Sequence, residues 1–448
     1  MTIRLSDHFS YGRLLRFTLP SIVMMIFTSI YSVVDGLFVS NLVGDMALSA
    51  VNIVFPVTMI VGAFGFMLGT GGSAIVSRTM GEGQPELADR YFTMIIAAVL
   101  LLGAVLSALG AVFAGPVARL AGASDALMDD CVAYGRIMLG GSAAFMLQTT
   151  FQSFFVVAER PRLGLLFTVA SGLTNIVGDY VFIAVLRRGI AGAAAATVIA
   201  QTLSGAGLAA YTWRRCRELL PLPGEFRLEG AVFRELWGLS SLTCLQQCAM
   251  NFGILLIQRL VDSFGPVTMA AFAAGVKIDA FAYLPVQDFG NAFSTFVAQN
   301  YGAGQSERLR RGFRRAMALS LGFACLLSAA VAGFAESLMG LFLQPEETAV
   351  LAAGVRYLRI EGAFYPGIAC LFLLYGIYRA VRRPGMSVVL TVLSLGTRVA
   401  LAYALAGPVG ESGIWWAIPI GWFLADAVGL GYYFRHRRTL LPDRRSEE

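Results

Sequence analysis

The chain has 448 residues, of which 57% are hydrophobic and 14% are charged, and its mean hydropathy is +0.70. Soluble domains carry roughly 25% charged residues, so this composition predicts a polytopic membrane protein. A nucleic-acid-binding protein is excluded, because the net charge of +6 is spread over short connections and forms no soluble basic face. The apolar runs exceed the roughly ten residues of a membrane β-strand and do not alternate, which indicates an all-α fold.

Twelve apolar segments are long enough to cross a bilayer, which takes about 20 residues. We expect spans near 15–40, 47–77, 91–115, 131–157, 163–186, 190–213, 236–262, 267–299, 313–343, 354–380, 386–406 and 413–435. Basic residues gather at both termini and in the even-numbered connections. The positive-inside rule then places both termini in the cytoplasm. We therefore expect a multi-pass membrane protein that contacts lipids.

The first span, residues 18–41, contains a single carboxylate, Asp35, and no basic residue lies between Arg16 and Arg78. A charge at this depth is costly, and it usually belongs to a transport or proton pathway. Pro20 lies early in the same span, where its missing N–H can kink the helix. The segment therefore predicts an ion-responsive acid on a helix with a hinge at Pro20.

The sequence repeats itself at a shift of 221 to 223 residues. The matching motifs are GEGQ at 81–84 with GAGQ at 302–305, YGRI at 134–137 with YLRI at 357–360, Arg160-Pro161 with Arg383-Pro384, and Gly189 and Gly192 with Gly410 and Gly413. Each half holds an even number of spans, so the halves are expected to form two six-helix bundles related by a pseudo-two-fold axis along the membrane normal. We expect an N-lobe at 1–213, a cytoplasmic linker at 214–235, and a C-lobe at 236–448 with a basic cytoplasmic tail.

Each Gly-x-Gly-Gln motif follows the second span of its half. A tight turn closing the helix is the favoured interpretation, because glycine adopts the positive φ that such a turn needs. A phosphate-binding loop is the alternative.

The chain lacks the motifs of the common enzyme classes. Its only lysine, Lys277, stands in AAGVKIDAF, so there is no P-loop for ATP hydrolysis. There is no HExxH, and the only histidines, His8 and His436, lie outside the central parts of the spans. We therefore expect no enzyme activity and no cofactor, which leaves transport driven by an ion gradient.

Polar residues of the N-terminal half gather in a few spans. Asn175 and Asp179 lie one turn apart in the fifth span, Thr197 lies in the sixth, and Tyr134 opens the fourth. With Asp35 they supply two carboxylates, an amide, a hydroxyl and a phenol, and this half has no basic residue in the central parts of its spans. This set suits a bound proton, or Na⁺ held by Asp35, Asn175, Asp179 and Thr197. A purely structural hydrogen-bond network is the alternative, disfavoured by the cost of two unneutralised carboxylates.

The C-terminal half has charged span residues of both signs. They are Arg259, Asp262, Lys277, Asp279, Asp288, Arg398 and Asp426. Asp279 and Arg398 are candidates for binding substrate or the coupling ion, and for Arg398 the alternative is a partner of a nearby acid. Salt-bridged or interface-facing groups are the alternative for most of the set, and the sequence leaves the roles of Lys277, Asp279, Arg398 and Asp426 open. Gln148, Gln152, Met24 and Met146 are candidates, with Asp279, for a cavity that accepts flat hydrophobic cations. Ordinary packing is the alternative for the methionines.

The five tryptophans, at positions 213, 237, 415, 416 and 422, lie near the expected ends of spans. Tryptophan is enriched where a membrane meets water, so we expect all five to anchor the helices at the interface.

In these features the chain resembles the multidrug and toxic compound extrusion (MATE) family, in particular its MepA-like bacterial branch. The resemblance rests on twelve spans in two halves, on LPSI at 19–22 and on VVDGLFV at 33–39. It implies a cation site formed by Asp35, Asn175, Asp179, Thr197 and Tyr134, and a first helix that bends at Pro20. The Lys277-Ile278-Asp279 stretch is similar to a family pattern in the eighth span. The tenth-span aspartate of another branch has no clear counterpart in residues 364–379.

With this resemblance, the combined expectation is a monomeric secondary active antiporter of the bacterial inner (plasma) membrane. It would export amphipathic organic cations in exchange for protons or sodium by alternating access. The alternative is a flippase for a lipid-linked precursor in the same superfamily. A flippase would favour a cavity lined with Arg and Lys to hold pyrophosphate. The N-terminal half offers no such residues, which argues against the alternative.

Overall fold

The computed structural model describes residues 11–215, 230–343 and 347–440, and every regular element in these ranges is a helix. Eleven helical stretches of this part of the chain are long and apolar enough to cross a membrane. The remaining expected span, 131–157, is formed by two shorter helices, α6 (Met128–Gly140) and α7 (Ser142–Val157). The prediction of an all-α membrane protein with twelve spans is confirmed.

The described chain divides into two compact units, one made of residues 23–80 and 84–244 and the other of residues 11–22, 81–83 and 245–440. The predicted linker at 214–235 falls largely on 216–229, and part of the basic tail falls on 441–448, both outside the described residues. The predicted limits of the two lobes therefore stay a prediction.

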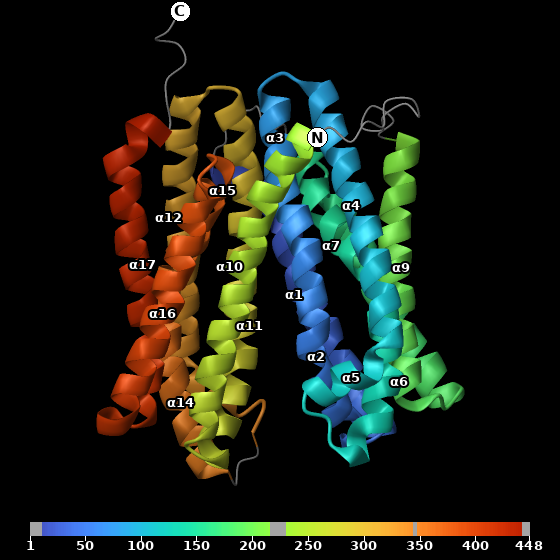
Figure 1. Cartoon of the computed structure of the whole chain (residues 1–448). Helices are drawn as coiled ribbons and strands as arrows, with labels where there is room; N and C mark the ends of the chain where they lie inside the picture. The colour runs from blue at the N-terminus through green and yellow to red at the C-terminus, as the bar shows by residue number, and fades with distance from the viewer. Residues whose placement is uncertain (1–10, 216–229, 344–346, 441–448) are drawn as a thin grey trace, which may run out of the picture. The chain divides into compact units, whose positions relative to one another are not determined.

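The first unit, drawn in blue to green in Figure 1, has a continuous series of helices. They are α1 (Tyr11–Leu42), which begins before the unit, α2 (Asp45–Phe66), the π-helix η1 (Met67–Gly71), α3 (Gly72–Gly81), α4 (Pro85–Val112), α5 (Ala114–Leu120), the 3₁₀ turn η2 (Asp125–Leu127), α6, α7, α8 (Pro161–Asp179), the π-helix η3 (Tyr180–Val185) and α9 (Gly189–Arg215). Helix α7 packs against α2, α4 and α9, so it lies inside the unit.

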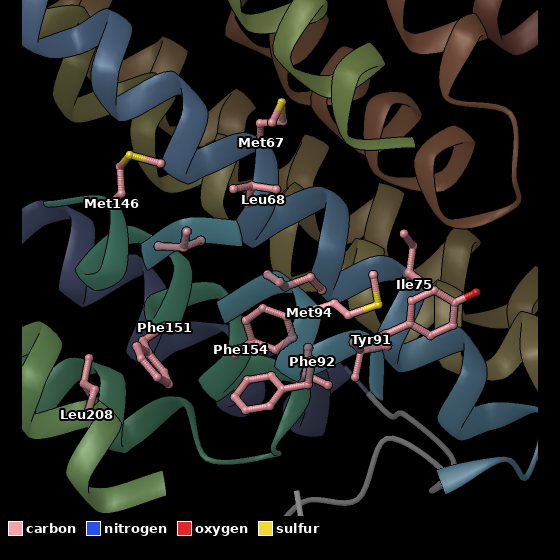
Figure 2. Close-up of a cluster of buried hydrophobic side chains, with 14 of the residues drawn as sticks. Met67, Leu68, Ile75, Tyr91, Phe92, Met94, Met146, Phe151, Phe154 and Leu208 are labelled. Atoms are coloured by element: carbon pink, nitrogen blue, oxygen red, sulfur yellow. The ribbon is translucent and has the colours of Figure 1, made fainter. Parts of the chain in front are cut away.

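The core of the first unit is an aromatic and aliphatic cluster contributed by α2, η1, α3, α4, α6, α7 and α9 (Figure 2). The ring of Phe92 meets Phe154 edge-on, with centroids 4.9 Å apart. Met146 of α7 is completely buried in this cluster. In lipid, such packing takes over much of the role that the hydrophobic effect plays in water, so this cluster holds α4 and α7 in register.

The second unit contains α10 (Gly230–Asp262), of which only the part after residue 244 belongs to it, and the helices that follow. These are α11 (Pro266–Gly302), α12 (Ser306–Gly333), α13 (Ala335–Met339), α14 (Thr348–Glu361), the 3₁₀ turn η5 (Gly362–Phe364), α15 (Tyr365–Ala380), α16 (Pro384–Val409) and α17 (Glu411–Leu440). Helix α15 packs against α11, α12, α16 and α17. It is buried on all sides, as expected of a central membrane helix.

The backbone of each half repeats that of the other at matched positions. Positive φ angles occur at Gly44 and Gly265, Gly83 and Gly304, Glu159 and Arg382, and Gly189 and Gly410. All four pairs have the spacing of the sequence repeat. The angles of 76° at Gly83 and 66° at Gly304 confirm the expected turn in each Gly-x-Gly-Gln motif.

The tryptophan prediction is wrong for two of the five residues. Trp415 has no exposed surface and Trp422 is only 7% exposed. The ring of Trp415 stacks on Phe272 with centroids 5.6 Å apart and meets Tyr357 edge-on at 4.9 Å. The prediction was based only on position near the end of a span. In the structure, the rings of Trp415 and Trp422 point from α17 toward α11, α14 and α15. Trp237 and Trp416 are 53% and 42% exposed, as an interface anchor requires.

A close backbone contact between α11 and α15 leads to a first testable prediction. A Cβ atom on Gly376 would lie 2.7 Å from the carbonyl oxygen of Gly290. Gly376→Ala should therefore separate the two helices and lower the free energy of unfolding by about 1–3 kcal/mol, as overpacking does. Gly322→Ala is the control, because a Cβ there meets nothing within 4 Å. Thermal unfolding of the detergent-solubilised protein measures both, and equal midpoints would contradict the prediction.

Candidate functional site

Two carboxyl groups of the first unit, Asp35 on α1 and Asp179 at the end of α8, interact with each other. Asp179 has no exposed surface, and neither of its carboxyl oxygens receives a hydrogen bond from the described residues. The buried Oδ1 of Asp35 likewise has no such donor. Two ionised carboxylates are acceptors only, so they can hydrogen-bond to each other only when one carries a proton. The pair is thus arranged to bind a proton or another cation.

Asn175 lies one turn before Asp179 and is 1% exposed. Its Nδ2 donates to Oγ1 of Thr197 on α9 at 3.2 Å. This bond orients the amide, and Oδ1 of Asn175 receives no hydrogen bond within the described part of the chain. The predicted neighbours Asn175 and Thr197 are therefore in contact, with a buried amide oxygen still available to a cation or a donor.

Two tyrosines surround the carboxyl pair. Tyr134 on α6 interacts electrostatically with both Asp35 and Asp179 and is 6% exposed. Tyr31, one turn before Asp35 on α1, interacts with Asp35. Sequence reasoning identified Tyr134 but not Tyr31, although the i, i+4 spacing to Asp35 would have indicated it. No basic group among the described residues is among the charges that act on the two acids.

The helix changes its geometry next to this site. The α-helical part of the fifth span ends at Asp179, and the π-helix η3 begins at Tyr180. Short π-helical segments inside α-helices are frequent at functional sites. Asp179 therefore lies where the backbone hydrogen bonds change from the α-helical to the wider π-helical pattern. The sequence did not predict this change.

The predicted cavity residues lie in different surroundings. Met146 is in the core cluster described above, and Gln148 is 5% exposed. Nε2 of Gln152 donates to Oγ1 of Thr168 at 3.2 Å. Met24 on α1 is 5% exposed and lies beside Gly164 of α8. Their role as a substrate cavity stays a prediction.

The second unit contains a buried cluster that the sequence predicted only in part. Tyr357 of α14 and Tyr365 of α15 donate hydrogen bonds to the two carboxyl oxygens of Asp279 on α11. Glu361, the last residue of α14, is 7% exposed, and its Oε2 has no partner among the described residues. Arg398 of α16 acts electrostatically on both acids.

Sequence reasoning selected Asp279 and Arg398 of this cluster but missed Glu361 and the two tyrosines. Tyr357 is the repeat counterpart of Tyr134, and Glu361 follows it at i+4. These two signals could have indicated the cluster. Of the other charged candidates, Lys277 is exposed, and Asp426 interacts with the thiol of Cys370.

These features define a helical membrane protein with a buried acid pair in its first unit. The MatE family model matches residues 20–181 and 243–404, which together form more than half of the chain. The chain therefore belongs to the MatE family of efflux transporters, as the sequence resemblance predicted. The two matches begin at residues 20 and 243, and the same number of positions separates Thr168 from Thr391. The internal repeat is therefore confirmed.

Known proteins resemble the chain over nearly its whole length. The "FAD transporter" of Shewanella oneidensis is 26% identical over 96% of this chain and 95% of its own length. The "Multidrug export protein MepA" of Staphylococcus haemolyticus is 20% identical, covering 97% of this chain and 96% of its own length. A crystal structure described as MATE in complex with MaD3S has a TM-score of 0.91 at 22% identity, covering 98% of both chains.

Proposed function

We propose that this chain is a secondary active antiporter that exports amphipathic organic cations in exchange for protons or sodium by alternating access. The observation that carries the proposal is the Asp35–Asp179 pair, whose buried carboxyl groups interact without a basic partner among the described residues. A pair of this kind binds a cation and releases it when the surroundings change. Family membership supports the transport role, and it does not favour the lipid-flippase alternative.

The test is efflux of a fluorescent cationic dye from vesicles that contain the purified protein. A proton gradient and a sodium gradient are imposed separately, each without the other. Gradient-driven dye movement with either ion supports the proposal and identifies the coupling ion. Dye movement that depends on neither gradient would overturn the proposal.

A second candidate substrate is a flavin dinucleotide, because one relative of similar length is named as an FAD transporter. Arg379 of α15 is 6% exposed, and its Nη1 donates to Asn291 at 3.2 Å. A buried guanidinium suits a pyrophosphate group. Loading the same vesicles with FAD distinguishes the two: FAD efflux without dye efflux would show that FAD, and not an organic cation, is the substrate.

We further propose that the chain lies in the bacterial inner membrane with both termini and the 214–235 segment in the cytoplasm. A cysteine at Gly224 should resist a membrane-impermeant thiol reagent added to intact cells, whereas a cysteine at Ser263 should react, because the positive-inside rule puts them on opposite sides. The native cysteines are first replaced by serine. Permeabilised cells supply the control, and labelling of position 224 in sealed cells would reverse the orientation.

We also propose that α1 bends at Pro20 during transport. Pro20 lies inside the continuous helix α1, where an interior proline costs about 3 kcal/mol or more. Pro20→Ala should therefore keep or raise the thermal stability and lower the rate of dye efflux. Pro408→Ala is the control, since Pro408 lies inside α16 and should affect stability alone. Unchanged efflux in Pro20→Ala would show that the bend is not used.

A further inference from the structure

Arginines from two helices gather at one end of the second unit, where α12 begins and α17 ends (Figure 1). Arg310 and Arg314 lie one turn apart near the start of α12, and Arg437 lies in the last turn of α17. All three guanidinium groups act electrostatically on the phenol of Tyr433, which is 6% exposed. The ring of Tyr433 packs against Phe313 of α12 with centroids 4.8 Å apart. This aromatic contact between α12 and α17 brings the three cations, the arginine group, around one point.

The arginine group is positively charged within the described part of the chain. The charges that act on Tyr433 there are these three cations, and none is an acid. Glu307 of α12 acts on Arg310 and Arg314, but it forms an ion pair with Arg311 at 2.7 Å. Since Glu307 and Arg311 cancel each other, the group stays positive. Like charges this close repel one another, so an anion bound among them would be favourable.

The matching positions of the first unit lack the two arginines of α12. At the spacing that relates the two Gly-x-Gly-Gln motifs, Arg310 corresponds to Asp89 and Arg314 corresponds to Thr93 of α4. Each half has an even number of spans, so both halves enter the membrane in the same direction and need the same topology signal. A topology signal alone therefore does not explain why only α12 has arginine at these two positions.

The surface beside the arginine group is apolar and exposed. Phe434, the neighbour of Tyr433, is 61% exposed. On α12, Ala318 and Gly322 follow Arg314 at one-turn intervals, and both are exposed. A Cβ on Gly322 would meet nothing within 4 Å. This side of the helix therefore has space for an acyl chain that extends from a headgroup held by the arginines.

We propose that Arg310, Arg314 and Arg437 bind the phosphate of an anionic phospholipid, whose acyl chain lies along the exposed apolar side of α12. Arginine binds phosphate through parallel N–H···O bonds, and basic pockets between membrane helices bind anionic headgroups. A free phosphate ion would share the headgroup contact but not the acyl-chain contact. The inference goes beyond the proposed antiport function and depends on neither its substrate nor its coupling ion.

The test is native mass spectrometry of the detergent-solubilised protein with dioleoylphosphatidylglycerol or dioleoylphosphatidylcholine, which have the same acyl chains. Phosphatidylglycerol should bind more tightly than phosphatidylcholine. Arg314→Gln/Arg437→Gln should weaken its binding about 30-fold, which corresponds to about 1 kcal/mol for each arginine. Arg119→Gln/Arg162→Gln is the matched control, because it removes the same charge from two exposed positions of the first unit and should leave the binding unchanged. Equal affinity for the two lipids, or an equal loss in the two double variants, would overturn the proposal.

A second measurement needs no variant and keeps the proposal testable if the arginine variant does not fold. A ligand of the folded state raises the thermal unfolding midpoint, so phosphatidylglycerol should raise it above the value in phosphatidylcholine, and inorganic phosphate should not. No rise with phosphatidylglycerol, or an equal rise with inorganic phosphate, would overturn the lipid site. Neither measurement involves transport: a vesicle assay without gradient-driven efflux would reject the antiport function and leave the lipid result standing.

Discussion

Replacing either Asp35 or Asp179 with asparagine is expected to abolish ion-coupled efflux while the protein still folds and reaches the membrane. The amide has nearly the same shape but cannot take up or release a proton. Removing a buried charge costs no stability, because the charge itself was unfavourable there. A potential of 100 mV is worth about 2.3 kcal/mol per exchanged charge, or about a 50-fold concentration ratio. Each variant should lose the substrate gradient that this coupling sustains.

The measurement combines dye efflux from vesicles with drug-induced proton release from the purified protein, with and without sodium. Asp125→Asn is the control, because Asp125 is an exposed acid of the same unit in the turn η2. The double variant should be no worse than either single one, since residues that act as a unit are not additive. If both single variants release protons and move dye like the unmodified chain, the coupling site lies elsewhere.

The arrangement of spans could be predicted from the sequence because it depends on long apolar runs and on turn residues. The structure confirms the twelve spans and the paired turns at Gly83 and Gly304. It also shows breaks that hydropathy cannot report, including the π-helices at 67–71 and 180–185. The fourth span breaks next to Gly141, where a Cβ would lie 2.6 Å from the Val198 side chain. Local breaks of this kind depend on tertiary packing and not on the length of an apolar run.

The two buried clusters differ in how far the sequence could indicate them. In the first unit Asp35 and Asp179 are the only acidic residues within the expected spans, so they stand out, and the structure places them together. In the second unit the spans contain several charges of both signs, so no single acid stands out. The repeat position of Tyr357 and the i+4 spacing of Glu361 point to the cluster, and the packing shows that Glu361 lies near Asp279 and Arg398. Trp415 was misassigned for a similar reason, since position along a span does not say which way a side chain points.

Arg398→Gln is expected to destabilise the protein far more than Arg356→Gln. Arg398 acts on two buried acids, and its Nε is itself buried. Removing Arg398 takes away the cation that acts on these buried acids. An uncompensated buried charge costs about 3–5 kcal/mol. Arg356, in contrast, pairs with Glu411 at 3.4 Å while its side chain is 52% exposed, and an exposed pair is worth at most about 1 kcal/mol. Equal unfolding midpoints for the two variants would contradict the prediction.

Second substitutions in the Arg398→Gln background can locate the uncompensated charge. If Glu361 holds a proton, the charge that Arg398 balances is on Asp279. Asp279→Asn should then restore part of the lost stability, although one tyrosine hydrogen bond is lost with the second carboxyl oxygen. Glu361→Gln should restore little, because it replaces one neutral group with another. Thermal unfolding of the three variants in the same detergent decides between them. Rescue by Glu361→Gln, with none by Asp279→Asn, would place the negative charge on Glu361 and the proton on Asp279.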